Sequence, residues 1–164
     1  MPNWCSNSMV VTGEPELVGV FVEQMISDSK KGDMTDLSVL DFGAVVPMPP
    51  LLMERKSPSD DGSITWYDWS IENWGTKWNA CEAHMEEYKK GDKQAFYNYE
   101  TAWGPAMAWQ EKVIEYFPWL TFDFEWEELG MNFCGSMTGT GGKVIEVVEG
   151  EIPKERYEEV FGDE

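Results

Sequence analysis

Hydrophobic and polar residues alternate most regularly in the C-terminal third of the chain, over residues 120–127. The apolar positions there are Leu120, Phe122, Phe124 and Trp126, and the polar positions between them are Thr121, Asp123, Glu125 and Glu127. Because successive side chains of a strand point to opposite faces, this spacing predicts a strand with one buried face and one acidic face.

Other segments show weaker versions of the same two periodicities. Strands are predicted at residues 4–12, 41–46, 132–138 and 143–149, which are short apolar runs bounded by turn residues. Helices are predicted where apolar residues recur every three to four positions, at 15–29, 64–73 and 106–117, and a short helix is predicted within the acidic tail at 154–161. If the second of these continued, Tyr67, Ile71, Trp74 and Trp78 would line one side, although Gly75 is expected to end it.

Residues 80–89 fit two structures. Propensity favours a helix between Ala80 and Glu87, whereas Gly91-Asp92-Lys93 followed by residues 96–101 is typical of a hairpin. We predict strand, turn and strand here. Residues 139–142, three of which are glycine, are predicted as a second hairpin turn.

The connection over residues 33–65 is long, and its Pro47, Pro49 and Pro50 are expected to forbid a regular helix or central strand. Residues 57–63 are rich in serine and aspartate, so disorder or a covering flap is expected. Helices that alternate with mainly antiparallel strands predict an α+β, ferredoxin-like fold with the helices on one face of the sheet. The predicted domain is 1–149, with a loop insertion at about 47–65 and an acidic tail at 150–164.

Tryptophan is concentrated around Trp74-Gly75-Thr76-Lys77-Trp78-Asn79, where four of the nine tryptophans fall within thirteen residues. Indole rings most often pack in a core, which is the more frequent role of such a cluster. Polar side chains beside the rings also suit a site that stacks on a ligand. The hypothetical ligand-binding set comprises Trp74, Lys77, Trp78, Asn79, Trp103 and Asn7.

The formal net charge is −19 and the pI is near 4.2. Such a charge opposes binding to nucleic acid or to an anionic membrane, whereas it suits solubility, a cation or a basic protein partner. The candidate residues for contact with a basic protein are Asp123, Glu125, Glu127 and Glu128. The sequence shows no secretion signal and no apolar run that approaches a membrane span, which predicts a cytoplasmic location.

Catalytic and metal chemistry receive little support from the sequence. Three scattered cysteines and the single histidine, His84, form neither a zinc motif nor an iron–sulfur motif, so no cofactor is expected. Cys81 lies three residues before His84, which on a strand would put the two side chains on opposite faces and separate a nucleophile from its base. We therefore expect a protein that is not an enzyme.

Five short motifs occur in order along the chain. They are Met1-Pro2-Asn3-Trp4-Cys5-Ser6-Asn7, Pro47-Met48-Pro49, Trp74-Gly75-Thr76-Lys77-Trp78-Asn79-Ala80, Thr101-Ala102-Trp103-Gly104-Pro105, and Glu128-Leu129-Gly130 leading to Phe133-Cys134-Gly135. With these motifs, roughly residues 1–149 resemble the YubB-type family of ferredoxin-like domains. The resemblance implies a ferredoxin-like fold and an origin on a phage, plasmid or other mobile element, and it implies no particular chemistry.

Two functions of different kinds are compatible with these features. The first is a small acidic accessory protein of a phage or mobile element that binds a basic host protein in the bacterial cytoplasm, for example to inhibit a host defence. The alternative is a protein that binds and sequesters a small nucleotide-like ligand through the tryptophan, lysine and asparagine side chains named above.

Overall fold

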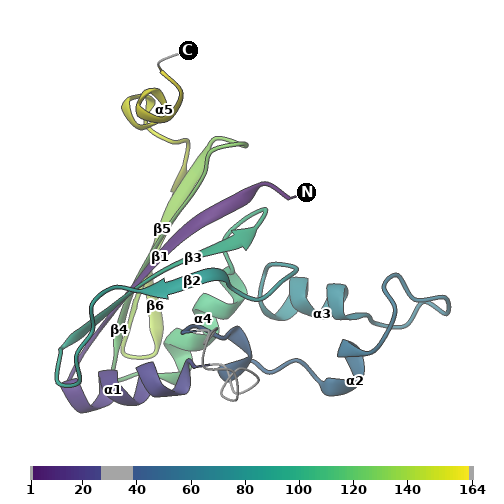
Figure 1. Cartoon of the computed structure of the whole chain (residues 1–164), viewed down its shortest axis with the longest axis horizontal. Helices are drawn as coiled ribbons and strands as arrows, with labels where there is room; N and C mark the ends of the chain where they lie inside the picture. Colours follow the sequence, from purple (N-terminus) through teal and green to yellow (C-terminus); the bar gives the residue numbers. More distant parts are fainter. Residues whose placement is uncertain (1, 27–38, 163–164) are drawn as a thin grey trace.

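A computed structural model of the chain describes residues 2–26 and 39–162. Its centre is one six-stranded sheet in which every pair of neighbouring strands is antiparallel (Figure 1). The strands are β1 (Trp4–Thr12), β2 (Cys81–Met85), β3 (Gln94–Ala102), β4 (Thr121–Glu128), β5 (Phe133–Thr140) and β6 (Lys143–Gly150). Their order across the sheet is β2-β3-β1-β4-β5-β6, so β1 lies between two strands that come much later in the chain.

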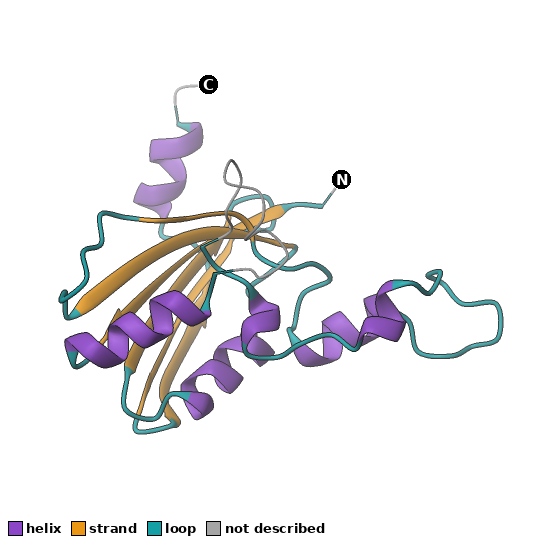
Figure 2. Ribbon diagram, turned by 60° about the horizontal axis from the view of Figure 1, so that its bottom comes forward, coloured by secondary structure: helices purple, strands orange, loops and turns teal. Residues whose placement is uncertain are grey.

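The helices lie on one side of this sheet or beyond its ends. They are α1 (Pro15–Gln24), the 3-10 helix η2 (Phe42–Ala44), α2 (Pro50–Met53), α3 (Trp66–Asn73), α4 (Met107–Tyr116) and α5 (Lys154–Phe161). Figure 2 shows α1 and α4 against the same face of the strands. The predicted α+β, ferredoxin-like fold with helices on one face is therefore confirmed.

The core lies between that face and the helices α1 and α4. Phe122 and Phe124 of β4 are stacked at 6.0 Å, and they meet Phe21 of α1 and Trp109 of α4 edge to face. All four side chains are almost fully buried. The alternation in residues 120–127 thus predicted both the strand and its buried face correctly, because Asp123 and Glu125 are exposed on the other side.

Several predicted elements are confirmed. Residues 81–102 form the hairpin of β2 and β3 and not a helix, and its turn contains Gly91 with φ +106°. α3 ends just before Gly75, whose φ of +87° is incompatible with a continuing helix. α5 spans Lys154–Phe161, the residues at which a short helix was predicted.

Residues 41–46 are not a strand as predicted, because a 3-10 helix forms there. The Asp41 carboxylate accepts a hydrogen bond from the backbone N–H of Gly43 at 2.8 Å, which caps η2. The Phe42 ring then packs on Trp109 with ring centroids 4.5 Å apart. A local cap and one long-range contact thus override the apolar run.

Three other elements also differ from the predictions. α1 ends at Gln24 and not near Ser29, and residues 27–32, where its end was expected, lie outside the described residues. A short helix, α2, does form in the proline-rich segment, because Pro50 occupies its first turn, where a missing N–H is tolerated. β5 continues through Thr140, so the second hairpin turn contains only Gly141 and Gly142.

The inward side of α3 does not include Tyr67 and Ile71. Tyr67 and Ile71 are exposed, whereas Ser70 and Trp74 are buried. The loop between α2 and α3 reaches away from the sheet in Figure 1, so residues 57–63 do not form the covering flap. Within the described residues, no helix is both long and apolar enough to span a lipid bilayer.

Candidate functional site

The Trp74-Gly75-Thr76 part of the tryptophan motif packs the C-terminal end of α3 against α4. The indole N–H of Trp74 donates to the Val46 carbonyl at 2.9 Å, and the Trp74 carbonyl accepts from the backbone N–H of Trp109 at 3.2 Å. A side chain at Gly75 would lie 3.1 Å from the backbone nitrogens of α4, so this close contact requires glycine. Trp74 is buried, and its one donor is already used within the fold.

The two asparagines of the hypothetical ligand-binding set are also engaged internally. Asn79 accepts from the backbone N–H of Phe42 at 2.9 Å and donates to the Asp41 carboxylate at 2.7 Å. Asn7 is buried and donates to the Thr101 hydroxyl at 2.8 Å. Asn79 thereby holds η2 in place, and Asn7 ties β1 to β3.

Four residues of the set line one shallow cleft, namely Trp74, Lys77, Trp78 and Asn79. The cleft has a volume of about 310 Å³ and also contacts Trp66. The Lys77 ammonium lies 4.0 Å from the centre of the Trp78 ring, so this cluster already contains one cation–π contact. Asn7 and Trp103 do not line the cleft, and Trp103 is half-exposed elsewhere.

Trp78 also contacts Trp4, the first residue of β1, with ring centroids 5.9 Å apart. Trp4 belongs to the polar face of its strand, together with Ser6, and its side chain is 40% exposed. Its ring forms part of a second cavity of about 470 Å³, lined also by Ser6, Cys81, Glu82 and Glu100. Trp4 was not among the predicted site residues, although a tryptophan on the polar side of a two-residue alternation is the pattern that indicates an exposed ring.

The predicted protein-interaction residues do not share one environment. Asp123 and Glu125 are exposed at the middle of the sheet face that α1 and α4 leave open. Glu127 is on the same face, but its carboxylate binds Arg156 of α5 at 2.7 Å. That arginine lowers the pKa of Glu127, chiefly through the hydrogen bond.

Glu128 is not available to a partner, contrary to the prediction. It is only 1% exposed, and its carboxylate accepts hydrogen bonds from the backbone N–H groups of Gly130 at 2.7 Å and Met131 at 2.9 Å. It therefore stabilises the turn after β4. Its position on the buried side follows from the same alternation that exposes Glu125.

Cys81 and His84 were expected on opposite faces, which is wrong because β2 contains a bulge between them. They pair with Glu100 and Asn98, two residues that share the open face of β3. No hydrogen bond joins Cys81 to His84 among the residues described. Burial raises the pKa of the Cys81 thiol, and the charges of Glu82 and Glu100 raise it further, which disfavours the thiolate.

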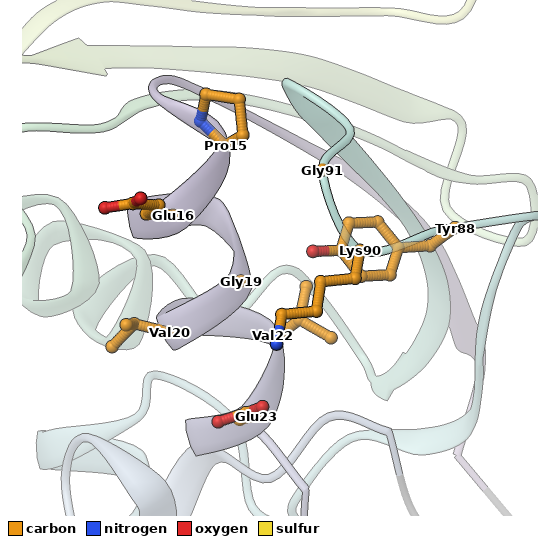
Figure 3. Close-up of a pocket in the computed structure, with 9 residues that line it drawn as sticks. All are labelled: Pro15, Glu16, Gly19, Val20, Val22, Glu23, Tyr88, Lys90 and Gly91. Carbon is orange, nitrogen blue, oxygen red and sulfur yellow. The ribbon is translucent and has the colours of Figure 1, made fainter.

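A third cavity, of about 390 Å³, lies between α1 and the turn that joins β2 to β3 (Figure 3). Its lining combines the apolar Val22 and Tyr88 with Glu16, Glu23 and Lys90, so charges of both signs surround it. This chemistry selects no class of ligand. In the described part of the chain, no group of three or more histidine, cysteine or acidic side chains is arranged to hold a metal ion.

Comparison with known proteins places the chain in a family. The sequence model for the ferredoxin-like domain in Api92-like proteins matches residues 73–162, from the end of α3 to the end of α5. The chain belongs to this Api92-like family. The crystal structure of a protein api92 from Yersinia pseudotuberculosis superposes with a TM-score of 0.68, at 9% identity, over 93% of this chain and 99% of that one. At such low identity the Api92 structure supports the fold alone, and no curated protein sequence matches the chain.

Within this Api92-like fold, two candidate surfaces therefore remain. One is the open acidic face around Asp123 and Glu125, with the adjoining cavity at Trp4. The other is the cleft at Lys77, whose neighbours Trp74 and Asn79 are largely committed to holding the domain together.

Proposed function

We propose that this protein acts by binding, without catalysis, to a protein that presents a basic surface. In this proposal it is a small accessory protein of a phage or other mobile element, of the YubB type, that works in the cytoplasm of the host bacterium. Inhibition of a host defence protein is one such role. The observation that carries the proposal is the open face of the sheet, on which carboxylates are held by a rigid central strand.

The chemistry of this face supports a protein partner. Asp123 and Glu125 project from β4, which is paired on both sides, so their backbone is fixed before binding. Hydroxyl and amide side chains surround them, including Ser8, Asn98 and Thr138, whose hydroxyl donates to Asp123 at 3.1 Å. Such a surface can accept many hydrogen bonds from lysine and arginine, and its negative field accelerates association with a basic partner.

The test reverses the charge of this face and compares it with an equal reversal elsewhere. The variant Asp123→Lys/Glu125→Lys should lose the host protein that the wild type retains, and the salt dependence of any residual binding should flatten. The matched control is Glu111→Lys/Glu115→Lys on the exposed side of α4, which changes the net charge equally. If both variants bind the partner as the wild type does, the open face is not the site; if both lose it equally, net charge alone explains the interaction.

A second candidate function is supported by the cleft at Lys77. Four of the six residues selected for binding a nucleotide-like ligand do line one cleft, and Lys77 is a cation there that could pair with a phosphate. A native mass spectrum after incubation with host extract should then show a gain of a few hundred daltons. Lys77→Ala should abolish the gain, and a gain that survives this substitution would assign the ligand to another place.

A further inference from the structure

The cavity at Trp4 lies where the ends of β1, β2 and β3 meet on the open face. One wall is the Trp4 ring, which contacts the Trp78 ring with centroids 5.9 Å apart. The remaining lining includes Ser6, Glu82 and Glu100. An exposed indole in contact with a second ring offers a fixed flat surface, which is unusual among the small polar side chains of this face.

The two carboxylates at this cavity have no cation beside them. Glu100 accepts a hydrogen bond from the Ser6 hydroxyl at 3.1 Å, and no lysine or arginine of the described chain pairs with Glu100 or Glu82. The pKa of Glu100 is raised by its partial burial and by the nearby charge of Glu82, despite the hydrogen bond that lowers it. The free protein thus holds two mutually repelling carboxylates next to an aromatic ring.

The local backbone holds the two carboxylates at the Trp4 cavity. Glu82 occupies the bulge of β2 with φ +47°, a conformation that non-glycine residues seldom adopt. Glu100 is fixed by the register of β3, opposite Ser6 on one side and Cys81 on the other. The carboxylates are therefore placed by the sheet and not by flexible loops.

We propose that this cavity binds the guanidinium group of an arginine side chain, which stacks on Trp4 and donates hydrogen bonds to Glu100 and Glu82. The proposal rests on the proposed function, because the arginine would belong to the basic partner of the open face. A guanidinium is planar, stacks on indole and carries several donors in a fixed fork, so it matches a flat ring flanked by carboxylates better than an ammonium does. An anion would be repelled, and no metal-binding arrangement exists here within the described residues.

An arginine–glutamate ion pair already exists on the same face of the sheet. Arg156 of α5 donates two hydrogen bonds to Glu127, which lies beside Ser6 in the register of β1 and β4. Glu100 flanks Ser6 on the other side and has no such arginine in the described chain. The Trp4 cavity thus contains a carboxylate placed like that of Glu127, but no arginine of the described chain pairs with it.

The test is a titration with the peptide acetyl-Gly-Arg-Gly-amide, followed by the indole N–H signals in the NMR spectrum. We expect a saturable shift of the Trp4 signal, and Trp4→Leu or Glu100→Gln should weaken binding by about tenfold or more. The control Glu146→Gln removes an exposed carboxylate of the same face on β6, outside the cavity, and it should change the affinity less than about twofold. The lysine peptide acetyl-Gly-Lys-Gly-amide should bind at least several-fold more weakly.

Each other outcome overturns the proposal. No saturable shift, equal weakening by Glu146→Gln, or equal affinity for the lysine peptide would show only general attraction to an acidic face. A failure of the proposed function alone is recognised by a different result. In that case the arginine peptide still binds the cavity, and the Asp123→Lys/Glu125→Lys protein keeps its host partner. A misfolded variant is excluded by recording its melting curve, and Glu100→Gln is expected to be at least as stable as the wild type.

Discussion

Arg156 of α5 donates two hydrogen bonds to the carboxylate of Glu127 on β4, from Nη2 to Oε1 at 2.7 Å and from Nε to Oε2 at 3.2 Å. No residue of α5 is buried, although Ile152 just before it is. Among the described residues, this C-terminal helix is therefore held by Ile152, by the hydrogen bond from the Cys134 thiol to the Glu151 carbonyl, and by the Arg156–Glu127 ion pair. Its attachment should be sensitive to changes that leave the rest of the domain intact.

Arg156→Ala should free α5 without unfolding the sheet. We expect faster amide hydrogen exchange across residues 154–161 and nearly the same melting temperature, because an exposed ion pair contributes little to global stability. Lys154→Ala is the control, since within the described part of the chain Lys154 pairs only with Glu158 of the same helix, at 3.8 Å. Unchanged exchange in Arg156→Ala would show that the ion pair does not hold the helix.

The same ion pair should be visible in the titration of Glu127. Its pKa in the folded protein lies below the ordinary value of 4.5, so the contribution of the pair is present above that value and is lost as the pH falls through the lowered pKa. An NMR titration of the Glu127 carboxylate should give a midpoint below 4.5 that rises in Arg156→Ala. A midpoint that does not respond to this substitution contradicts the ion pair.

Gly139→Ala should destabilise the domain by about 1–3 kcal/mol, because β5 passes directly under α4. A Cβ atom at this position would overlap the side chain of Ile114. Adding Ile114→Ala should recover part of that loss in a double-mutant cycle measured by urea unfolding. Gly150→Ala is the control, since a Cβ there meets nothing within 4 Å. Equal effects of the two glycine substitutions would contradict close packing at Gly139.

Gln110→Leu should stabilise the domain by about 1 kcal/mol. Gln110 is fully buried in α4, and neither amide atom makes a well-aligned hydrogen bond among the described residues, although the side chain lies close enough to the Tyr99 hydroxyl to oppose the rise in pKa that burial causes there. Leucine removes the unpaired polar atoms at similar size and helix propensity. Urea unfolding measures the change, with Glu111→Leu on the exposed side as the control. A loss of stability would indicate that Gln110 has a polar partner in the core, either the Tyr99 hydroxyl or a buried water molecule.

The sequence predicted best those elements whose burial depends on their own periodicity. The alternation of Phe122, Phe124 and Trp126 with acidic residues defined β4 and its two faces, because a strand buries every second residue wherever it lies. The hairpin at Gly91 and the end of α3 at Gly75 followed from the backbone freedom of glycine. These are local properties, so one sequence was enough to find them.

The failures arise from contacts between distant parts of the chain. Asp41 caps η2 with the help of Asn79, which lies 38 residues away, and no local pattern indicates that contact. The bulge at Glu82 reversed the predicted relation between Cys81 and His84. The candidate site was divided for the same reason, because Trp74 and Asn79 serve the packing of other elements whereas Trp4 gained its cavity only from the pairing of β1 with β3.

Cys5 should be the slowest of the three thiols to react. It is fully buried in β1, and its burial raises the pKa of its thiol to about 12, so very little thiolate forms at neutral pH. In a reaction with a thiol reagent, Cys5 should be modified only as fast as the domain unfolds, whereas Cys81 and Cys134 are partly accessible. Cys5→Ala should remove the slow phase. A slow phase that persists in this variant would assign it to another cysteine.

Glu100→Gln should raise the free energy of unfolding at neutral pH. The pKa of Glu100 in the folded protein is raised above the ordinary 4.5, which means that its ionised form destabilises the fold, and this effect disappears as the pH falls and both states become protonated. The gain from glutamine should therefore shrink toward zero in urea unfolding at acidic pH. A gain that is the same at acidic and neutral pH would mean that the carboxylate charge is not its cause. The variant is expected to be more stable and yet to lose binding of the arginine peptide. That result would mean that the repulsion between the Glu100 and Glu82 carboxylates lowers stability and is retained for ligand binding, as expected of a binding site and not of a core.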